Sequence, residues 1–167
     1  GLGSLGTGGV TNGISFLTES ALGYERRENY WLALFMGGTY IAAAGLSGRI
    51  MRLLERRAAW LSPRASLALV LAAIGLVCSL PSAATLITGE PPDWTIWLLI
   101  GVFAPATGLL WPIAESYLSG GRRGRDLRIA VGRFNIFWAG AIVLSFWFMG
   151  PWVREAPLSV LLALGVA

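Results

Sequence analysis

The sequence predicts an all-α fold: a polytopic bundle of transmembrane helices. Only 13% of the 167 residues are charged and 55% are hydrophobic, whereas soluble domains carry about 25% charged residues. The hydrophobic residues form long blocks, and a helix needs about 20 mostly apolar residues to cross a bilayer. Short polar gaps separate the blocks, so consecutive helices should run antiparallel. The blocks are too long and too uniformly apolar for the strands of a membrane barrel.

Five full helices and the start of a sixth are expected in chain order. They cover residues 1–17, 30–48, 65–88, 94–118, 129–149 and 158–167. The first is rich in glycine, and the third carries no charge. The fourth contains Pro105 and Pro112, which remove backbone donors and should bend it. Because the sixth block stops inside an apolar run, we expect the chain to be part of a longer one.

The arginines predict how the bundle is oriented. All thirteen basic residues are arginine, and they concentrate in two gaps, 49–64 and 119–128. The alternate gaps 18–29 and 89–93 have more acidic than basic residues. By the positive-inside rule, the two basic gaps and the N-terminus should lie in the cytoplasm. Because the arginines lie in these gaps, their charge does not indicate a nucleic-acid partner.

Small residues recur at spacings that let membrane helices pack closely. The pairs are Gly9 with Gly13, Gly38 with Ala42, Ala44 with Gly48, Ala68 with Ala72, and Gly75 with Ser79. Because the hydrophobic effect does not drive association within lipid, close backbone approach has to supply the contact energy. Together the pairs predict a compact bundle.

Two segments carry a resemblance to a known family. Residues 44–57, "AGLSGRIMRLLERR", follow the second helix, and residues 111–141, "WPIAESYLSGGRRGRDLRIAVGRFNIFWAGA", join the fourth helix to the fifth. This layout resembles the N-terminal half of a major facilitator superfamily transporter, in a bacterial branch. The family signature in the first segment is roughly G-x-L-a-D-R-x-G-R-R. Here Leu46 and Arg49 match it, whereas Gly48 stands at its acidic position and Ala44 and Met51 stand at its glycines.

The resemblance implies a fold and a function for the whole protein. It implies twelve helices in two six-helix halves around a central cavity, and alternating access for a small solute in the bacterial inner membrane. The first, second, fourth and fifth helices of each half would face the cavity. Since this chain supplies at most six helices, the implied partners are the bilayer and a second half or other membrane subunits. The loop signature, Gly48 and Arg49, would take part in conformational switching.

Ionisable residues inside a membrane are functional candidates because they are costly there. Glu115 should lie about four residues before the cytoplasmic end of the fourth helix, and Arg133 about four residues into the fifth. At about 1.5 Å per residue, both should lie roughly 6 Å inside the boundary, where they could pair. They are read either as a gate or substrate contact, or as a structural ion pair or side chains that reach the headgroups.

Three uncharged polar residues are further candidates. Asn135 lies in the fifth helix, and Thr11 and Asn12 interrupt the glycine-rich first helix. Such side chains either bind a substrate or form hydrogen bonds between helices.

Other functions find no support in the sequence. The chain has no histidine, no CxxC pair and no G-x-S-x-G, so we expect no enzyme, no metal site and no cofactor. Its single cysteine, Cys78, lies in an apolar block. The opening "GLGSLG" matches the dinucleotide-binding pattern G-x-G-x-x-G, but the acidic residues at the required distance, Glu19 and Glu25, fall in a polar gap instead of at a strand end.

The alternative to a transporter is a structural or accessory subunit of a larger respiratory or photosynthetic membrane complex.

Overall fold

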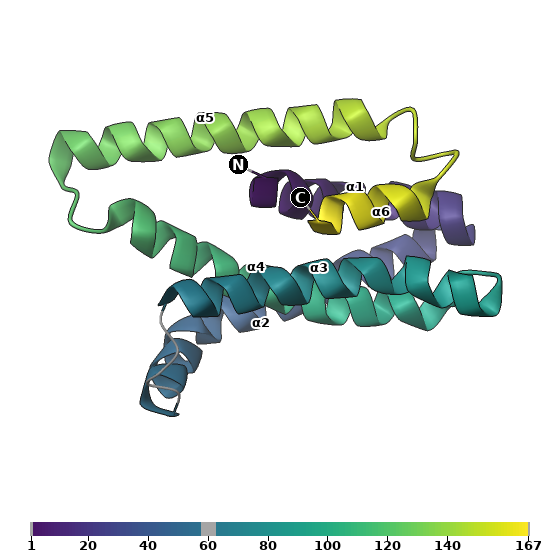
Figure 1. The fold of residues 1–167 in the computed structure, drawn as a ribbon, viewed down its shortest axis with the longest axis horizontal. Helices are drawn as coiled ribbons and strands as arrows, with labels where there is room; N and C mark the ends of the chain where they lie inside the picture. Colours follow the sequence, from purple (N-terminus) through teal and green to yellow (C-terminus); the bar gives the residue numbers. More distant parts are fainter. Residues whose placement is uncertain (1, 58–62, 167) are drawn as a thin grey trace.

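A computed structural model describes residues 2–57 and 63–166, and within this part of the chain it contains six α-helices and no strand (Figure 1). The helices are α1 (Leu2–Leu22), α2 (Arg26–Arg57), α3 (Pro63–Thr88), α4 (Asp93–Ser119), α5 (Gly124–Met149) and α6 (Pro157–Val166). The predicted all-α class is therefore confirmed. Gly1 and Ala167, the outer ends of the first and last predicted blocks, lie outside the described residues.

Four of the described helices are long and apolar enough to cross a membrane. The candidate spans are Arg26–Leu53, Arg64–Thr88, Asp93–Ser119 and Gly124–Trp152. The helices α1, with 21 residues, and α6, with 10, are not among them. By length and composition the chain has the helices of a membrane protein, and six crossings remain a prediction.

The helix α2 extends furthest beyond its predicted end. It continues for nine residues past Gly48, to Arg57. Most of these residues are arginine, leucine, methionine and glutamate, which favour helix and include no proline. Gly48 and Arg49 therefore lie inside α2 and not in the loop where the family resemblance places them. The basic charge of this segment is carried on the last turns of a helix.

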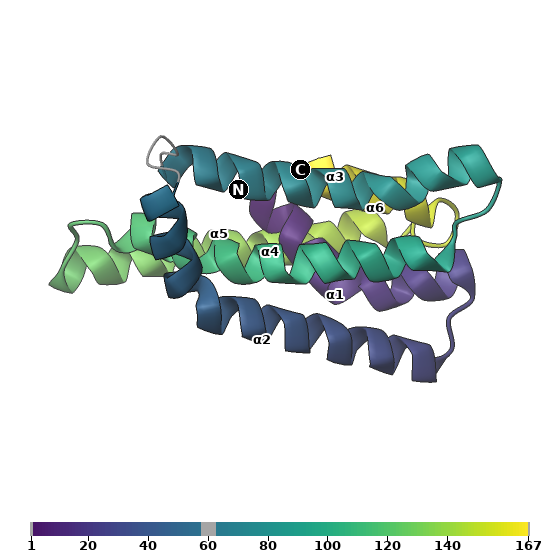
Figure 2. The ribbon, with the colours of Figure 1, turned by 90° about the horizontal axis from the view of Figure 1, so that it is seen from below.

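The helices pack in a pattern that repeats between the first three and the last three. α2 packs on α4, as α5 packs on α1; α3 packs on α4, as α6 packs on α1; and α3 and α6 pack on each other. If α1 is interchanged with α4, α2 with α5, and α3 with α6, the same five packed pairs result. The additional contact of α4 with α5 has no counterpart of similar extent between α1 and α2. Figures 1 and 2 show α5 at one side of the bundle and α2 at another.

A Thr-Gly pair occupies equivalent places in the two central helices. Thr7 and Gly8 lie on α1, and Thr107 and Gly108 lie on α4. Both threonines are buried, with 4% and 3% of their surface exposed. A Cβ added at Gly8 would meet Ile142 of α5 at 2.6 Å, and one added at Gly108 would meet the Tyr40 carbonyl oxygen of α2 at 2.8 Å. At both places the absence of a side chain lets a parallel neighbouring helix approach closely.

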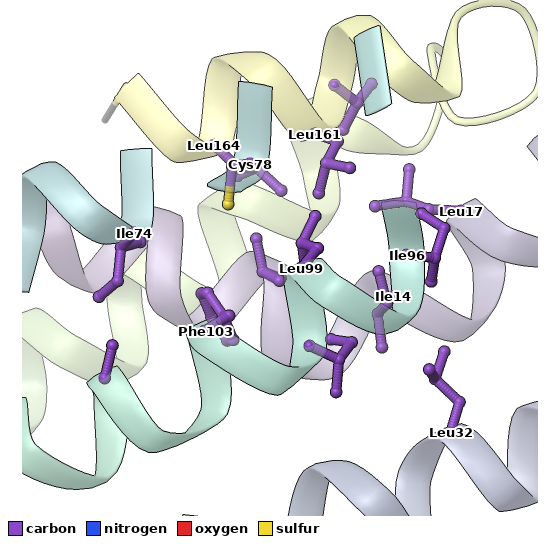
Figure 3. Packing of buried hydrophobic residues seen from close by; sticks show 14 of the residues in the cluster. Ile14, Leu17, Leu32, Ile74, Cys78, Ile96, Leu99, Phe103, Leu161 and Leu164 are labelled. Atoms are coloured by element: carbon purple, nitrogen blue, oxygen red, sulfur yellow. The ribbon is translucent and has the colours of Figure 1, made fainter. Parts of the chain in front are cut away.

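The helix α4 lies at the centre of the core. In the most apolar stretch of α4, 56% of the residues are buried, whereas the corresponding share in α5 is 11%. Ile96, Leu99 and Phe103 of α4 belong to one cluster with residues of the surrounding helices (Figure 3). The labelled members from those helices are Ile14, Leu17, Leu32, Ile74, Cys78, Leu161 and Leu164.

The predicted small-residue contacts form at some pairs and not at others. A Cβ added at Gly9 would meet Leu164 of α6 at 2.7 Å, and one added at Gly13 would meet Met149 at 2.6 Å. A Cβ at Gly75 would meet the Gly165 carbonyl oxygen at 3.0 Å. By contrast, a Cβ at Gly38 meets nothing within 4 Å, and its predicted partner Ala42 is exposed. The predicted small residues therefore mark close helix contacts on α1 and α3, but not at Gly38 and Ala42 of α2.

The turn between α1 and α2 contains a buried tyrosine whose ionisation should destabilise the fold. Burial, followed by the charges of Asp93 and Glu28, raises the pKa of Tyr24 above its ordinary 10.0, although a hydrogen bond with Trp97 acts in the opposite direction. The folded state therefore holds the phenol proton more tightly than the unfolded chain. The stability that results is complete below pH 10 and is lost as the pH rises through the folded-state pKa.

We expect the midpoint temperature of thermal unfolding of the wild type to decrease as the pH rises above 10. The midpoint temperature of Tyr24→Phe should decrease less. Thermal unfolding followed by circular dichroism across this pH range measures the difference. The control is Tyr30→Phe, because Tyr30 is exposed on α2. Equal alkaline losses for the wild type and Tyr24→Phe would contradict the prediction.

Candidate functional site

A cavity of about 310 Å³ opens between four of the helices, α1, α2, α4 and α5. Its size falls at the lower end of the range of small-molecule pockets, about 300–1,000 Å³. The lining residues are Thr7, Gly8, Thr11, Asn12, Met36, Gly37, Tyr40, Phe103, Ala104, Thr107, Trp111 and Trp138. No described residue of α3 or α6 belongs to this lining. The two central helices thus contribute both to the core and to the cavity, and Phe103 of α4 belongs to both.

Aromatic rings form the α4–α5 part of the lining. The ring centroids of Trp111 and Trp138 lie 6.1 Å apart at an interplanar angle of 89°. Phe134, also on α5, packs edge-on against Trp111 at 6.1 Å and 78°. Such edge-to-face pairs are favourable because the positive ring edge meets the negative ring face. Trp111 therefore contacts two aromatic residues of α5, which restricts its ring at the cavity.

Polar groups come from α1 and α4. The Asn12 Nδ2 atom donates a hydrogen bond to the Gly8 carbonyl oxygen at 2.8 Å. The Thr107 hydroxyl donates to the Ala104 carbonyl oxygen at 2.9 Å, a common arrangement within helices. Thr11 and Asn12 are exposed at the open side of the cavity. Both residues were candidates in the sequence, and the structure brings them into one site.

Glu115 and Arg133 do not pair with each other among the described residues. Glu115 lies four residues before the end of α4, as expected, but α5 begins at Gly124 and not at residue 129. Arg133 therefore lies nine residues into its helix, or about 14 Å at 1.5 Å per residue, and not the expected 6 Å. The early start of α5 moves the two residues out of register by more than one turn.

The surroundings of Arg133 are those of the arginine-rich turn. It lines a shallow pocket with Arg122 and Asp126, and neither Glu115 nor Asn135 is among its lining residues. Arg122 itself caps α4, because its Nη1 atom donates to the carbonyl oxygens of Leu118 at 2.7 Å and Tyr117 at 3.3 Å. Glu115, Arg133 and Asn135 are exposed and lie outside the cavity lining.

Among the cavity residues that the sequence did not indicate, four are aromatic: Tyr40, Phe103, Trp111 and Trp138. In an apolar block an aromatic residue looks the same whether it faces lipid, the core or a cavity. One signal was available for the tryptophans. Trp111 and Trp138 lie well inside their helices, away from the interfacial positions where tryptophan is usual.

Comparison with protein-family models, curated proteins and solved structures gives no match to this chain.

Proposed function

We propose that this chain is one half of a secondary transporter of the major facilitator type, and that its open cavity forms half of the solute pathway. The observation that carries the proposal is the cavity itself, which is lined by polar and aromatic side chains. Three of its four lining helices, α2, α4 and α5, are long and apolar enough to cross a membrane. The lining helices are α1, α2, α4 and α5, the ones that the family resemblance implies. The solute would move by alternating access, and no catalytic step is involved.

The repeated packing pattern supports this proposal. Transporters of many folds are built from repeats with inverted topology, and their substrate sites lie where the repeats meet. In this chain α1 and α4 are equivalent in the pattern of helix pairs, and they would cross the membrane in opposite directions. Both contribute to the cavity. A site at this position is the place where two inverted three-helix units would bind a solute.

Open glycines on α2 and α5 support a second half beside the cavity. A Cβ added at Gly38, Gly45, Gly132 or Gly140 would meet nothing within 4 Å among the described residues. Glycine inside a helix costs about 1 kcal/mol relative to alanine, and at these positions no close approach of another described segment explains the glycine. Since small residues let membrane helices approach, these positions suit the helices of a second six-helix block.

The proposed orientation places both arginine-rich ends in the cytoplasm. Figure 1 shows the end of α2 and the α4–α5 turn at the same end of the bundle. The α1–α2, α3–α4 and α5–α6 connections lie at the opposite end. By the positive-inside rule the arginine-rich end, with the start of α1, would face the cytoplasm of a bacterial cell.

We expect Gly140→Leu in the full-length protein to abolish or strongly reduce solute uptake into membrane vesicles, because the added side chain would separate the two halves. The matched control is Ala72→Leu, which adds similar bulk to an exposed position on α3, away from the cavity. Uptake should survive the control. A complete reading frame without a second block of six apolar segments would sink the proposal.

The second candidate function is that of an accessory subunit in a larger membrane complex. The same open glycines and the exposed tryptophans Trp31, Trp94 and Trp147 suit packing against other subunits. This function predicts that partners co-purify with the wild type at fixed stoichiometry and that Gly140→Leu releases the chain from them. It also predicts that neither the wild type nor Gly140→Leu supports solute uptake. Purification in mild detergent and an uptake assay on the same membranes distinguish the two functions.

A further inference from the structure

The chemistry of the cavity lining indicates what kind of solute it can bind. None of the described lining residues carries a charge. The charged candidates on the neighbouring segments, Glu115 and Arg133, lie outside the lining. A charged solute would have to leave water for a site without an opposite charge, which costs several kcal/mol, on the order of what buried charges lose elsewhere. The lining of this half therefore disfavours a net charge.

One side of the cavity offers flat apolar surfaces. Trp111 and Trp138 stand perpendicular to each other, and Tyr40 and Phe103 complete the aromatic part of the lining. Indole and phenol rings bind a flat apolar face by stacking or edge contacts. Because Trp111 already packs against Phe134 and Trp138, little side-chain entropy is lost when a ligand packs against it.

The other side of the cavity offers hydrogen bonds to neutral groups. The Asn12 amide uses one N–H for the Gly8 carbonyl, which leaves the second N–H and the Oδ1 acceptor. The neighbouring Thr11 hydroxyl is exposed in the cavity lining. Donors and acceptors thus lie on α1, whereas the tryptophan rings of the lining lie on α4 and α5.

We infer that the cavity binds an uncharged solute with a flat apolar or aromatic body and hydrogen-bonding groups, the body against Trp111 and Trp138 and the polar groups at Thr11 and Asn12. This inference rests on the proposed transport function, since it names the class of solute that the same cavity would carry. A cationic solute is the main competing class, because tryptophan faces also attract cations.

Three nitroaromatic probes of one shape and different charge test the inference. They are para-nitrobenzyl alcohol, para-nitrobenzoate and para-nitrobenzylammonium, and each quenches tryptophan fluorescence on contact. With the full-length protein in lipid nanodiscs, and empty nanodiscs as the partition control, the neutral probe should bind at least about tenfold more tightly than either ion. Tighter binding of an ion, or saturable binding of none of the three, would overturn the inference.

Matched variants place the binding in the cavity. Trp138→Ala should weaken binding of the neutral probe roughly fivefold, the scale of one lost aromatic contact, and Trp138→Phe should restore most of it. Trp147→Ala, on the same helix but 76% exposed, should leave binding unchanged. Asn12→Val should also weaken binding severalfold, whereas Asn135→Val should not. If Trp147→Ala weakened binding as much as Trp138→Ala, and Asn135→Val as much as Asn12→Val, the inference would be overturned. This comparison holds even where Trp138→Ala or Asn12→Val folds poorly.

Uptake of the three probes into vesicles separates this inference from the function on which it rests. Transport of an ion but not of the neutral probe would leave the transporter proposal standing and refute the inferred solute class. Tight binding of the neutral probe without uptake of any probe would support the solute class and count against transport.

Discussion

Replacing Gly108 by alanine is expected to destabilise the bundle by about 1–3 kcal/mol, the usual cost of overpacking a well-packed site. The added Cβ would lie 2.8 Å from the Tyr40 carbonyl oxygen, 3.1 Å from the Ala43 Cβ atom and 3.2 Å from the Ala44 nitrogen. Two of these atoms belong to the backbone of α2, so no side-chain rotation can relieve the clash. The helices α2 and α4 would have to separate along their whole contact. Reversible unfolding in mixed micelles, followed by circular dichroism, measures the loss.

Gly45→Ala is the matched control for this substitution. Gly45 also lies inside a helix, but a Cβ added there meets nothing within 4 Å. Since alanine favours helix over glycine by about 1 kcal/mol, this variant should be as stable as the wild type or slightly more stable. Opposite signs for the same chemical change would attribute the Gly108 effect to helix contact. If both variants shift in the same direction by similar amounts, the close approach at Gly108 does not limit stability.

Truncating Leu99 to alanine should produce the second large effect, a loss of about 1–3 kcal/mol. Leu99 is fully buried at the centre of the core, between Ile96 and Phe103 along α4 (Figure 3). In a soluble protein a buried Leu→Ala change costs about 2–5 kcal/mol, through lost transfer from water and the cavity that remains. In lipid the unfolded helix keeps its leucine in hydrocarbon, so only the packing part of that cost applies.

The neighbouring residue supplies the control. Leu98 is 46% exposed, so Leu98→Ala exchanges one lipid-facing side chain for another and should change stability by less than about 0.5 kcal/mol. The same unfolding experiment compares the two variants. A Leu98 effect as large as the Leu99 effect would mean that α4 has no distinct core face in the folded protein.

The sequence was sufficient for the fold class and for the places of the helices, because both depend on local composition. An apolar block of membrane length can hardly satisfy its backbone except as a helix, so the position of α4 could be predicted to within one residue at each end. Helix ends in polar segments were harder. α2 runs to Arg57 and α5 starts at Gly124, because arginine-rich segments can be helical and no proline or cap stops them.

The site could be predicted only in part, because it depends on which helices meet. Thr11 and Asn12 stood out as polar residues in an apolar helix, and they line the cavity. The expected pairing of Glu115 with Arg133 depended on helix ends that differ by five residues for α5. Trp111 and Trp138 line the cavity because α4 and α5 place them together, and an apolar pattern carries no information about that contact.

The burial of the single cysteine has a practical consequence for labelling. Cys78 lies within the core cluster, with none of its surface exposed, against Gly165 of α6. Thiol reagents in the surrounding water therefore have no native target among the described residues, and no cysteine-free parent is needed. A cysteine introduced at Gly45 or at Gly140 would be the sole reactive position. The rate at which a maleimide modifies it would show whether that face of α2 or α5 is accessible or covered.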